Sequence, residues 1–257
     1  MLTLEQIKEQ APTVFATAKA EHLTDKYIQT PTSRVVEDLM SMGWQVTKAQ
    51  EVKARKGKGF QKHMIVFRNP EIMIKGADGD DSFPQILLTN SHDGKAAFNF
   101  RVGIFRLVCS NGLTVSDSRF ESKIFKVRHF GKKAMDISEK VISGEIVANF
   151  FDLLPKLEEY VLQQMSVNLT EEKAIEFAMK AAALRFKRAF TENEAKVLLA
   201  SERFADDDNT LWAIQNRLQE KLINGFAGKR KYSALKDPNK TAIINERLAN
   251  LSMEFAN

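Results

Sequence analysis

The chain has 257 residues, of which 44% are hydrophobic and 28% are charged, as in an ordinary globular protein. Its 12 Gly, 6 Pro and single Cys exclude a collagen-like fibre and a disulfide-stabilised scaffold. No apolar run approaches the roughly 18 to 20 residues needed to span a bilayer, and the first residues lack the pattern of a secretory signal. We therefore expect a soluble cytoplasmic protein without a membrane partner.

The net charge of +5 is modest, but the charged residues are unevenly distributed along the chain. Residues 45–75 carry eight cations against two acids, and residues 119–133 carry six cations against one acid. Residues 217–247 carry eight cations against three acids, whereas acidic residues gather in the short segments 78–81 and 206–208. Such segregation favours a basic face that attracts a polyanion. The alternative is a set of ordinary strands and helices with solvated lysines.

The N-terminal pattern predicts two helices. The first is expected over Leu4 to Ala20 and is disturbed at Pro12, since proline removes a backbone donor and clashes with the preceding turn. The second is expected over Arg34 to Met42, with Thr32 or Ser33 as its N-cap.

Five strands are expected next, because β-branched and aromatic residues alternate there with polar ones. They are predicted over residues 44–55, 60–69, 86–90, 96–109 and 121–130. The first two flank Lys56-Gly-Lys-Gly59 and are expected to form a hairpin, with glycine supplying positive φ at the turn. The alternation changes phase at Gly103, which predicts a bulge.

After about residue 135 the apolar spacing becomes helical. Helices are predicted over residues 137–165, where Pro155 should cause a break or kink near Leu153, and over 170–186, from 191, over 211–224 and over 241–254. The order of elements predicts an α+β fold, with an antiparallel sheet and basic hairpin in the N-terminal half and a helical C-terminal half packed on it. We expect a helix-and-sheet region over residues 1–133 and a helical region over 134–257, within one continuous domain.

Residues of the kind that carry catalysis or bind metals form no recognisable set. The four histidines are His22, His63, His92 and His129, and none forms a pair at metal-ligand spacing. Ser91-His92-Asp93-Gly94 could support proton transfer, but we interpret it as a turn. Cys109 is interpreted as a buried structural thiol. We therefore expect no metal, no cofactor and no enzymatic activity, and a hydrolase centred on His92 and Asp93 is the third alternative.

The basic hairpin and the last strand suggest a different use. Lysine and arginine on a sheet can bind phosphates while aromatic rings stack on bases. Most of the 18 Phe must be core residues, and Phe60, beside the turn, is the strongest exception. Phe120, Phe125 and Phe130 interleave with the cations of the last strand. The candidate nucleic-acid-binding residues are Lys53, Arg55, Lys56, Lys58, Phe60, Lys62, Lys126 and Arg128.

Three segments carry a resemblance to a known family. They are Leu88-Thr-Asn-Ser-His-Asp-Gly94, Phe105-Arg-Leu-Val-Cys-Ser-Asn-Gly-Leu-Thr-Val115, and Asn209-Thr-Leu-Trp212 with Asn216-Arg-Leu-Gln-Glu220. From about Thr32 to its end the chain resembles the phage/plasmid-like protein family, domain of unknown function 932. That resemblance implies a bacterial host cell and a role in mobile-element DNA metabolism or in evasion of host defence. It transfers no catalytic residues.

The order of elements is also similar to that of single-strand annealing proteins, which form rings around a basic groove. We therefore expect a mobile-element DNA-binding protein that binds or anneals single-stranded DNA without catalysis, with a homo-oligomer as one potential assembly. Its cations would neutralise phosphates and leave the bases free to pair. The alternative is an interaction protein that inhibits a host defence or repair complex. The sequence does not decide whether the protein prefers single or double strands, or DNA or RNA.

Overall fold

The structure is a computed structural model. It describes residues 1–54, 58–75, 81–106, 112–114, 126–131, 139–202, 207–228 and 231–256. The contacts divide the chain into two compact units. Unit 1 comprises residues 1–73, 83–103 and 122–153, and unit 2 comprises residues 74–82, 104–121 and 154–257. The α+β class is confirmed, with the antiparallel sheet in the N-terminal half and a mainly helical C-terminal half.

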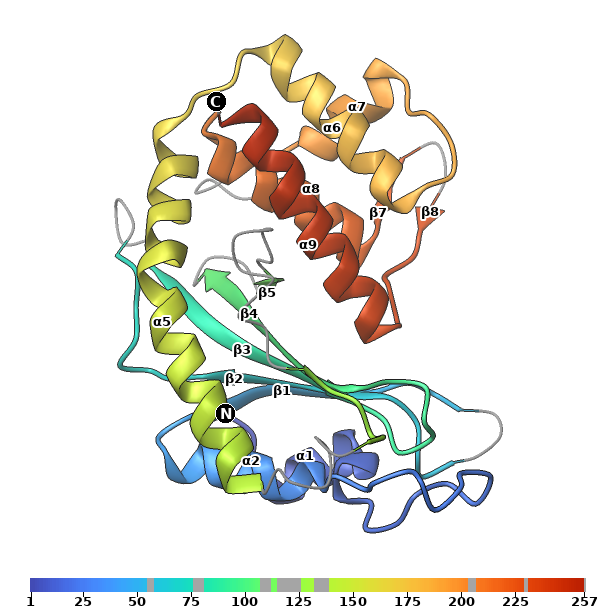
Figure 1. The fold of residues 1–257 in the computed structure, drawn as a ribbon. Helices are drawn as coiled ribbons and strands as arrows, with labels where there is room; N and C mark the ends of the chain where they lie inside the picture. Colours follow the sequence, from blue (N-terminus) through green and yellow to red (C-terminus); the bar gives the residue numbers. More distant parts are fainter. Residues whose placement is uncertain are drawn as a thin grey trace. The chain divides into compact units, whose positions relative to one another are not determined.

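The main sheet has the strand order β1-β2-β3-β4-β5, and β6 pairs with β4 (Figure 1). Its strands are β1 (Gln45–Glu51), β2 (His63–Arg68), β3 (Ser82–Asn90), β4 (Phe98–Arg106), β5 (Gly112–Thr114) and β6 (Lys126–Val127). The predicted hairpin is confirmed, since β1 pairs antiparallel with β2. Its strands are shorter than expected: the last pair of the two strands is Glu51 opposite His63, and one further backbone hydrogen bond joins the N–H of Val52 to the Lys62 carbonyl at 2.8 Å.

Other strand boundaries also differ from the prediction. β3 begins four residues earlier than expected, at Ser82, and all of its residues are buried. Of the strand expected over 121–130, the described part forms the two paired residues of β6, and Phe130 forms an isolated bridge with Tyr27. The register shift between Val46 and Lys48 in β1 was not anticipated. Cys109 lies outside the described residues.

The N-terminal segment is less helical than predicted. Helix α1 (Leu4–Gln10) opens with a capping box between Thr3 and Gln6, and a short 3-10 helix η1 (Pro12–Phe15) follows it. The helix therefore does not reach Ala20, because Pro12 starts the new turn. Helix α2 (Thr32–Ser41) begins two residues early, and its N-cap is Pro31, so neither Thr32 nor Ser33 caps it.

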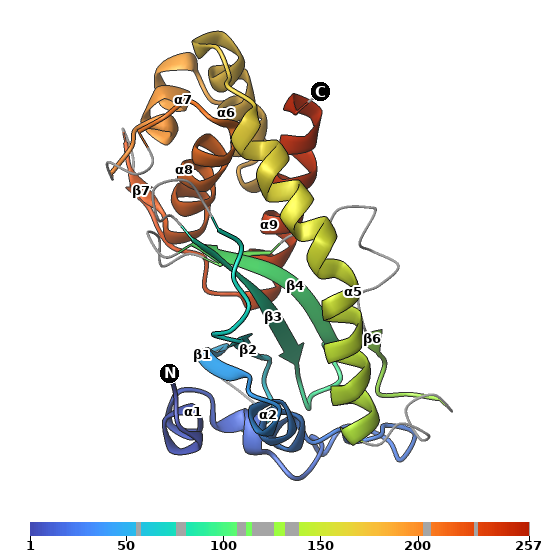
Figure 2. The same ribbon diagram turned by 90° about the vertical axis from the view of Figure 1, so that its left-hand side faces the viewer.

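Unit 1 has a core between the sheet and its helices. Figures 1 and 2 both show α1 and α2 on one side of β1 and β2. The buried side chains include Val35 and Leu39 of α2, Ile65 of β2 and Leu88 of β3. The first half of helix α5 (Glu139–Ser166) also belongs to unit 1, and its Phe150 packs edge-on against Trp44 with 4.7 Å between ring centroids.

Helix α5 continues through Pro155, so the chain has no break there, and of the predicted break or kink only the kink stays a prediction. The remaining elements of unit 2 are α6 (Glu171–Arg185), α7 (Glu192–Leu199), α8 (Leu211–Asn224), β7 (Phe226–Ala227), β8 (Lys231–Tyr232) and α9 (Pro238–Phe255). The hydroxyls of Thr170, Thr191 and Thr210 each accept a backbone hydrogen bond and cap the N-termini of α6, α7 and α8. In the described part of the chain no helix is long and apolar enough to cross a membrane.

The core of unit 2 is formed by α6, α7, α8 and α9. Small residues of α6, such as Ala178 and Ala182, allow it to approach the apolar residues of α8, which include Ile214 and Leu218. Helix α8 is buried on nearly all sides, including polar positions. One of these, Gln215, accepts a hydrogen bond of 2.8 Å from the Tyr160 hydroxyl. The buried side-chain oxygen of Gln215 therefore has a hydrogen-bond donor.

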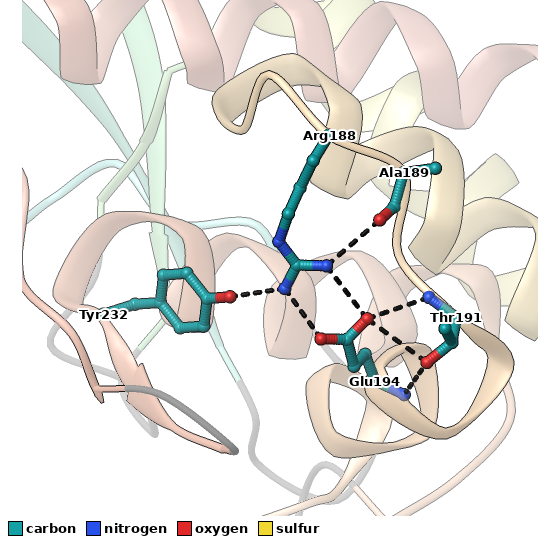
Figure 3. A network of polar contacts seen from close by, with 5 residues as sticks. All are labelled: Arg188, Ala189, Thr191, Glu194 and Tyr232. Carbon is teal, nitrogen blue, oxygen red and sulfur yellow. Dashed lines mark hydrogen bonds and ion pairs between the residues drawn. The ribbon is translucent and has the colours of Figure 1, made fainter.

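A polar network on the surface of unit 2 joins the α6–α7 connection to β8 (Figure 3). Arg188 donates to both carboxylate oxygens of Glu194, at 3.0 and 2.7 Å, and also to the Tyr232 hydroxyl. Glu194 in turn accepts from the backbone N–H of Thr191 at 3.0 Å. We call these residues the Arg188 network. The hairpin of β7 and β8 that it holds was not predicted from the sequence.

Candidate nucleic-acid interface

The register of the sheet brings two basic segments to one end of it. His63, the first residue of β2, lies opposite both Glu51, the last residue of β1, and Asn90, the last residue of β3. A short connection leads from Asn90 to β4, whose first residue, Phe98, lies opposite Val127 of β6. The hairpin turn and the residues after β6 therefore lie at the same end of the sheet. The basic end is defined here by Lys53, Lys58, Lys62, Lys126 and Arg128.

Most cations of the basic end are open to solvent. Lys53, Lys58, Lys126 and Arg128 are exposed, and Lys62 is half-buried. Lys95, on the connection between β3 and β4, adds an exposed cation that pairs with Asp93 at 3.1 Å. Two predicted members, Arg55 and Lys56, lie outside the described residues. The basic end therefore carries several exposed cations from two separate chain segments.

The aromatic residues of this end differ in their exposure. Phe60 is half-buried, and its carbonyl accepts a hydrogen bond of 2.9 Å from the backbone N–H of His92. Phe130 is 48% exposed, and its ring meets that of Tyr27 edge-on at 5.5 Å. The ring of Phe130 is therefore the more accessible stacking surface. Our candidate set omitted it, although alternation along the last strand places it with Lys126 and Arg128.

Three of the four histidines lie together inside unit 1, next to the basic end. His63 and His92 are 0% exposed and His129 is 3% exposed. The rings of His63 and His92 lie 5.3 Å apart, and the ring of His129 stacks on Tyr27 at 4.7 Å. Sequence spacing gave no sign of this, since the three residues come from different segments. Only His22 of the four is exposed.

Two of these histidines belong to a continuous chain of hydrogen bonds, which we call the histidine network. In order, its members are Glu51, Thr13, His63, Thr32, Asn90 and His129. The Thr13 hydroxyl lies 2.9 Å from Oε2 of Glu51 and 3.1 Å from Nδ1 of His63. The Thr32 hydroxyl lies 2.9 Å from Nε2 of His63 and 3.0 Å from Nδ2 of Asn90. Oδ1 of Asn90 lies 2.7 Å from Nε2 of His129, whose Nδ1 is 3.1 Å from the Ile28 carbonyl.

Burial keeps these imidazoles uncharged at neutral pH. It lowers the pKa of His63 to about 3 and that of His92 to about 4, and neighbouring histidines add repulsion in both cases. Burial also lowers the pKa of His129, with the Ile28 carbonyl acting in the opposite direction. No group of three or more His, Cys, Asp or Glu among the described residues is placed to hold a metal ion. The arrangement can therefore order hydrogen bonds and move protons.

The segment from Ser91 to Gly94 forms the turn that the sequence predicted. Gly94 has a φ of 75°, a conformation that disfavours side chains with a Cβ. The side chain of Asp93 accepts from the backbone N–H of Lys95 at 3.1 Å, and that of Ser91 accepts from Ala96 at 2.9 Å. His92 points inward, where its Nδ1 lies 3.0 Å from the side-chain amide of Gln29. These contacts tie the turn to the interior of unit 1.

The chain is similar to proteins that share most of its length. Residues 19–244 match the family described as Domain of unknown function (DUF932). UPF0380 protein YafZ of Escherichia coli strain K12 is 31% identical over 227 residues, which cover 87% of this chain and 78% of that protein. UPF0380 protein YfjQ of the same strain is 30% identical over 226 residues, with the same coverage. No solved structure matches the chain. The protein therefore belongs to the DUF932 family.

Proposed function

We propose that the basic end of the sheet binds single-stranded nucleic acid, with DNA favoured, and that it does so without covalent chemistry. The observation that supports this is the sheet register, which gathers exposed cations from the hairpin and from the residues around β6. Cations on two segments can neutralise successive phosphates of one strand. A protein that contacts only the phosphates in this way leaves the bases free to pair, and annealing of two strands requires such free bases.

The aromatic rings at this end give the proposal its preference for single strands. Phe130 lies two residues after Arg128 and is 48% exposed, so a base could stack on its ring beside a neutralised phosphate. A duplex keeps its bases stacked on one another and offers no free face to such a ring. The resemblance to proteins of phages and plasmids is consistent with a role in mobile-element DNA metabolism.

The direct experiment is a fluorescence-anisotropy titration with single- and double-stranded oligonucleotides at several salt concentrations. The key variant removes two cations, Lys126→Gln with Arg128→Gln. If both residues contact phosphates of single-stranded DNA, the slope of log K against log salt becomes shallower by about 1.4. The matched control, Lys173→Gln with Lys240→Gln, removes two exposed cations of unit 2 and should leave the slope unchanged.

A second pair of variants tests the stacking surface. Phe130→Ala should weaken binding of single strands by about 1 to 3 kcal/mol and leave the salt slope unchanged. Phe151, on α5, is 49% exposed and gives a matched control, so Phe151→Ala should bind like the wild type. Wild-type protein that binds no oligonucleotide at low salt would contradict the proposal. A host protein would then become the partner to seek.

A further inference from the structure

One acidic residue stands among the cations of the basic hairpin. Between residues 48 and 68 the chain carries seven lysines and arginines, and Glu51 is the only acid. In the described part of the chain no lysine or arginine forms an ion pair with Glu51, and both oxygens of its carboxylate accept hydrogen bonds from neutral groups. Glu51 therefore has a role other than pairing with the lysines around it.

These hydrogen bonds lead from the interior of unit 1 to the turn of the hairpin, and we call them the Glu51 clamp. The backbone N–H and the hydroxyl of Thr13 donate to Oε2 of Glu51, at 3.1 and 2.9 Å. Nε2 of Gln61 donates to Oε1 of Glu51 at 2.8 Å. Oε1 of Gln61 accepts from the backbone N–H of Gly59 at 2.7 Å. Because Thr13 is 1% exposed and Gly59 is exposed, the clamp joins a buried anchor to the surface beside Lys58.

Two backbone hydrogen bonds hold the same stretch of the hairpin. The Lys62 carbonyl accepts from the N–H of Val52 at 2.8 Å, and the Phe60 carbonyl accepts from the N–H of His92 at 2.9 Å. Each residue from 59 to 62 therefore has a hydrogen bond that fixes it. This stretch and the residue before it carry two cations of the basic end.

The carboxylate sets the direction of every bond in the clamp, because it can only accept. Gln61 must turn its amide nitrogen toward Glu51, which leaves its oxygen for the N–H of Gly59. A carboxamide at position 51 cannot serve both sides. If its oxygen accepts from Thr13, its nitrogen faces Gln61, whose amide must turn round and present its own nitrogen to Gly59. The bond to Gly59 is the one that is lost, because water can replace it there, whereas an unpaired N–H on buried Thr13 would be costly.

We propose that Glu51 is a positioning residue of the nucleic-acid interface, which holds Lys58 and Lys62 in place for the phosphates of a bound single strand. The inference rests on the proposed function of the basic end. A segment that is ordered before binding loses less conformational entropy when the strand arrives. The negative charge of Glu51 therefore promotes the binding of a polyanion, although Coulomb repulsion alone would weaken it.

The test is Glu51→Gln, which removes a negative charge from the basic end and one hydrogen bond from the clamp. Charge alone predicts tighter binding of a single-stranded oligonucleotide, whereas loss of the clamp predicts binding that is roughly threefold to tenfold weaker at low salt. Fluorescence anisotropy measures both proteins side by side. If the wild type binds and Glu51→Gln binds equally or more tightly, this inference is overturned alone. A wild type that does not bind overturns the proposed function, and this inference with it.

The exchanged pair, Glu51→Gln with Gln61→Glu, provides the rescue. The new amide at position 51 accepts from Thr13 and donates to the new carboxylate at position 61. The second oxygen of that carboxylate accepts from the N–H of Gly59, so every bond of the clamp is restored at the net charge of the wild type. The affinity should return to the wild-type value. A folded double variant that binds as weakly as Glu51→Gln would overturn the positioning role.

Hydrogen exchange measured by NMR separates positioning from general stability. In Glu51→Gln the amide of Gly59 should exchange roughly threefold to tenfold faster, while the amides of β2 keep their wild-type rates. Faster exchange throughout β2 would make Glu51 a residue of general stability and overturn the proposal.

Glu21→Gln is the matched control for charge. Glu21 is exposed, and its neighbour Ala20 donates to the His92 carbonyl at 3.0 Å, beside the residue that holds Phe60. This variant loses the same charge and keeps the clamp, so it should bind at least as tightly as the wild type. Weaker binding by Glu21→Gln would mean that loss of charge, and not of the clamp, explains the effect of Glu51→Gln.

Discussion

The histidine network of unit 1 and the Arg188 network of unit 2 both join side chains from several elements, but they differ in their access to water. The members of the first are buried except at the Glu51 end. In the second, the Arg188 side chain is 38% exposed. The histidines are neutral in the first network, whereas the second is built on an ion pair with two parallel hydrogen bonds.

This difference explains the opposite effects on the pKa values. Burial lowers the pKa of His63 and His92, because a charge inside unit 1 loses its hydration. The hydrogen bonds from Arg188 lower the pKa of Glu194 and those to Glu194 raise that of Arg188, since each partner stabilises the charge of the other. We therefore expect the stability of unit 1 to depend on pH and that of unit 2 to depend on salt.

The largest expected effect comes from cutting the buried network. Asn90→Ala leaves the Thr32 hydroxyl and Nε2 of His129 without their buried partner, which should lower the free energy of unfolding of unit 1 by about 3 kcal/mol. Arg188→Ala should have a smaller effect on unit 2, because water replaces the exposed partners. Urea unfolding followed by ¹⁹F NMR of 5-fluorotryptophan measures the units separately, since Trp44 lies in unit 1 and Trp212 in unit 2. Equal losses would remove the distinction between the networks.

Lowering the pH should destabilise unit 1 and so increase the difference between the two units. The folded-state pKa of His63 is about 3, below its usual value, so the unfolded chain binds protons first as the pH falls. His63 alone should then cost unit 1 about 2 kcal/mol between pH 7 and pH 5, with full stability retained above about pH 6.5. The same ¹⁹F unfolding curves at each pH measure this loss. His63→Gln should flatten the profile, and the exposed His22→Gln should not. A profile that is unchanged in His63→Gln would falsify this assignment.

The smallest expected effect concerns salt. One molar NaCl screens exposed charges but hardly reaches buried groups. The destabilisation caused by Arg188→Ala should therefore shrink in high salt, whereas that caused by Asn90→Ala should persist. Unfolding curves of both variants at low and high NaCl concentration provide the measurement. Loss of the Asn90→Ala effect in salt would mean that water and ions reach the histidine network.

Local signals explain which parts of the fold could be predicted from the sequence. The helices of unit 2 start at capping threonines such as Thr170 and Thr210, and Gly225, with a φ of 85°, ends α8. Strand ends were less predictable, because alternation continues beyond Glu51 although pairing stops there. The helix through Pro155 shows that the rest of α5 can compensate for one missing backbone donor.

The candidate site divides in the same way. The two basic segments could be recognised in the sequence as runs of cations, and the predicted hairpin placed the first of them at its turn. The histidine network was not visible, since its contacts join residues 31 to 101 positions apart. No local spacing encodes such pairs. Thr32 illustrates the difficulty, because a local rule made it a helix cap while the fold uses its hydroxyl between His63 and Asn90.

The central claim is that single-stranded nucleic acid binds at the basic end of the sheet. Hydrogen exchange followed by mass spectrometry, with and without a saturating single-stranded oligonucleotide, tests it most directly. The account predicts slower exchange in residues 52–62 and 126–131 and unchanged exchange in α6 and α9. Protection confined to unit 2, or no protection anywhere at saturation, would contradict it.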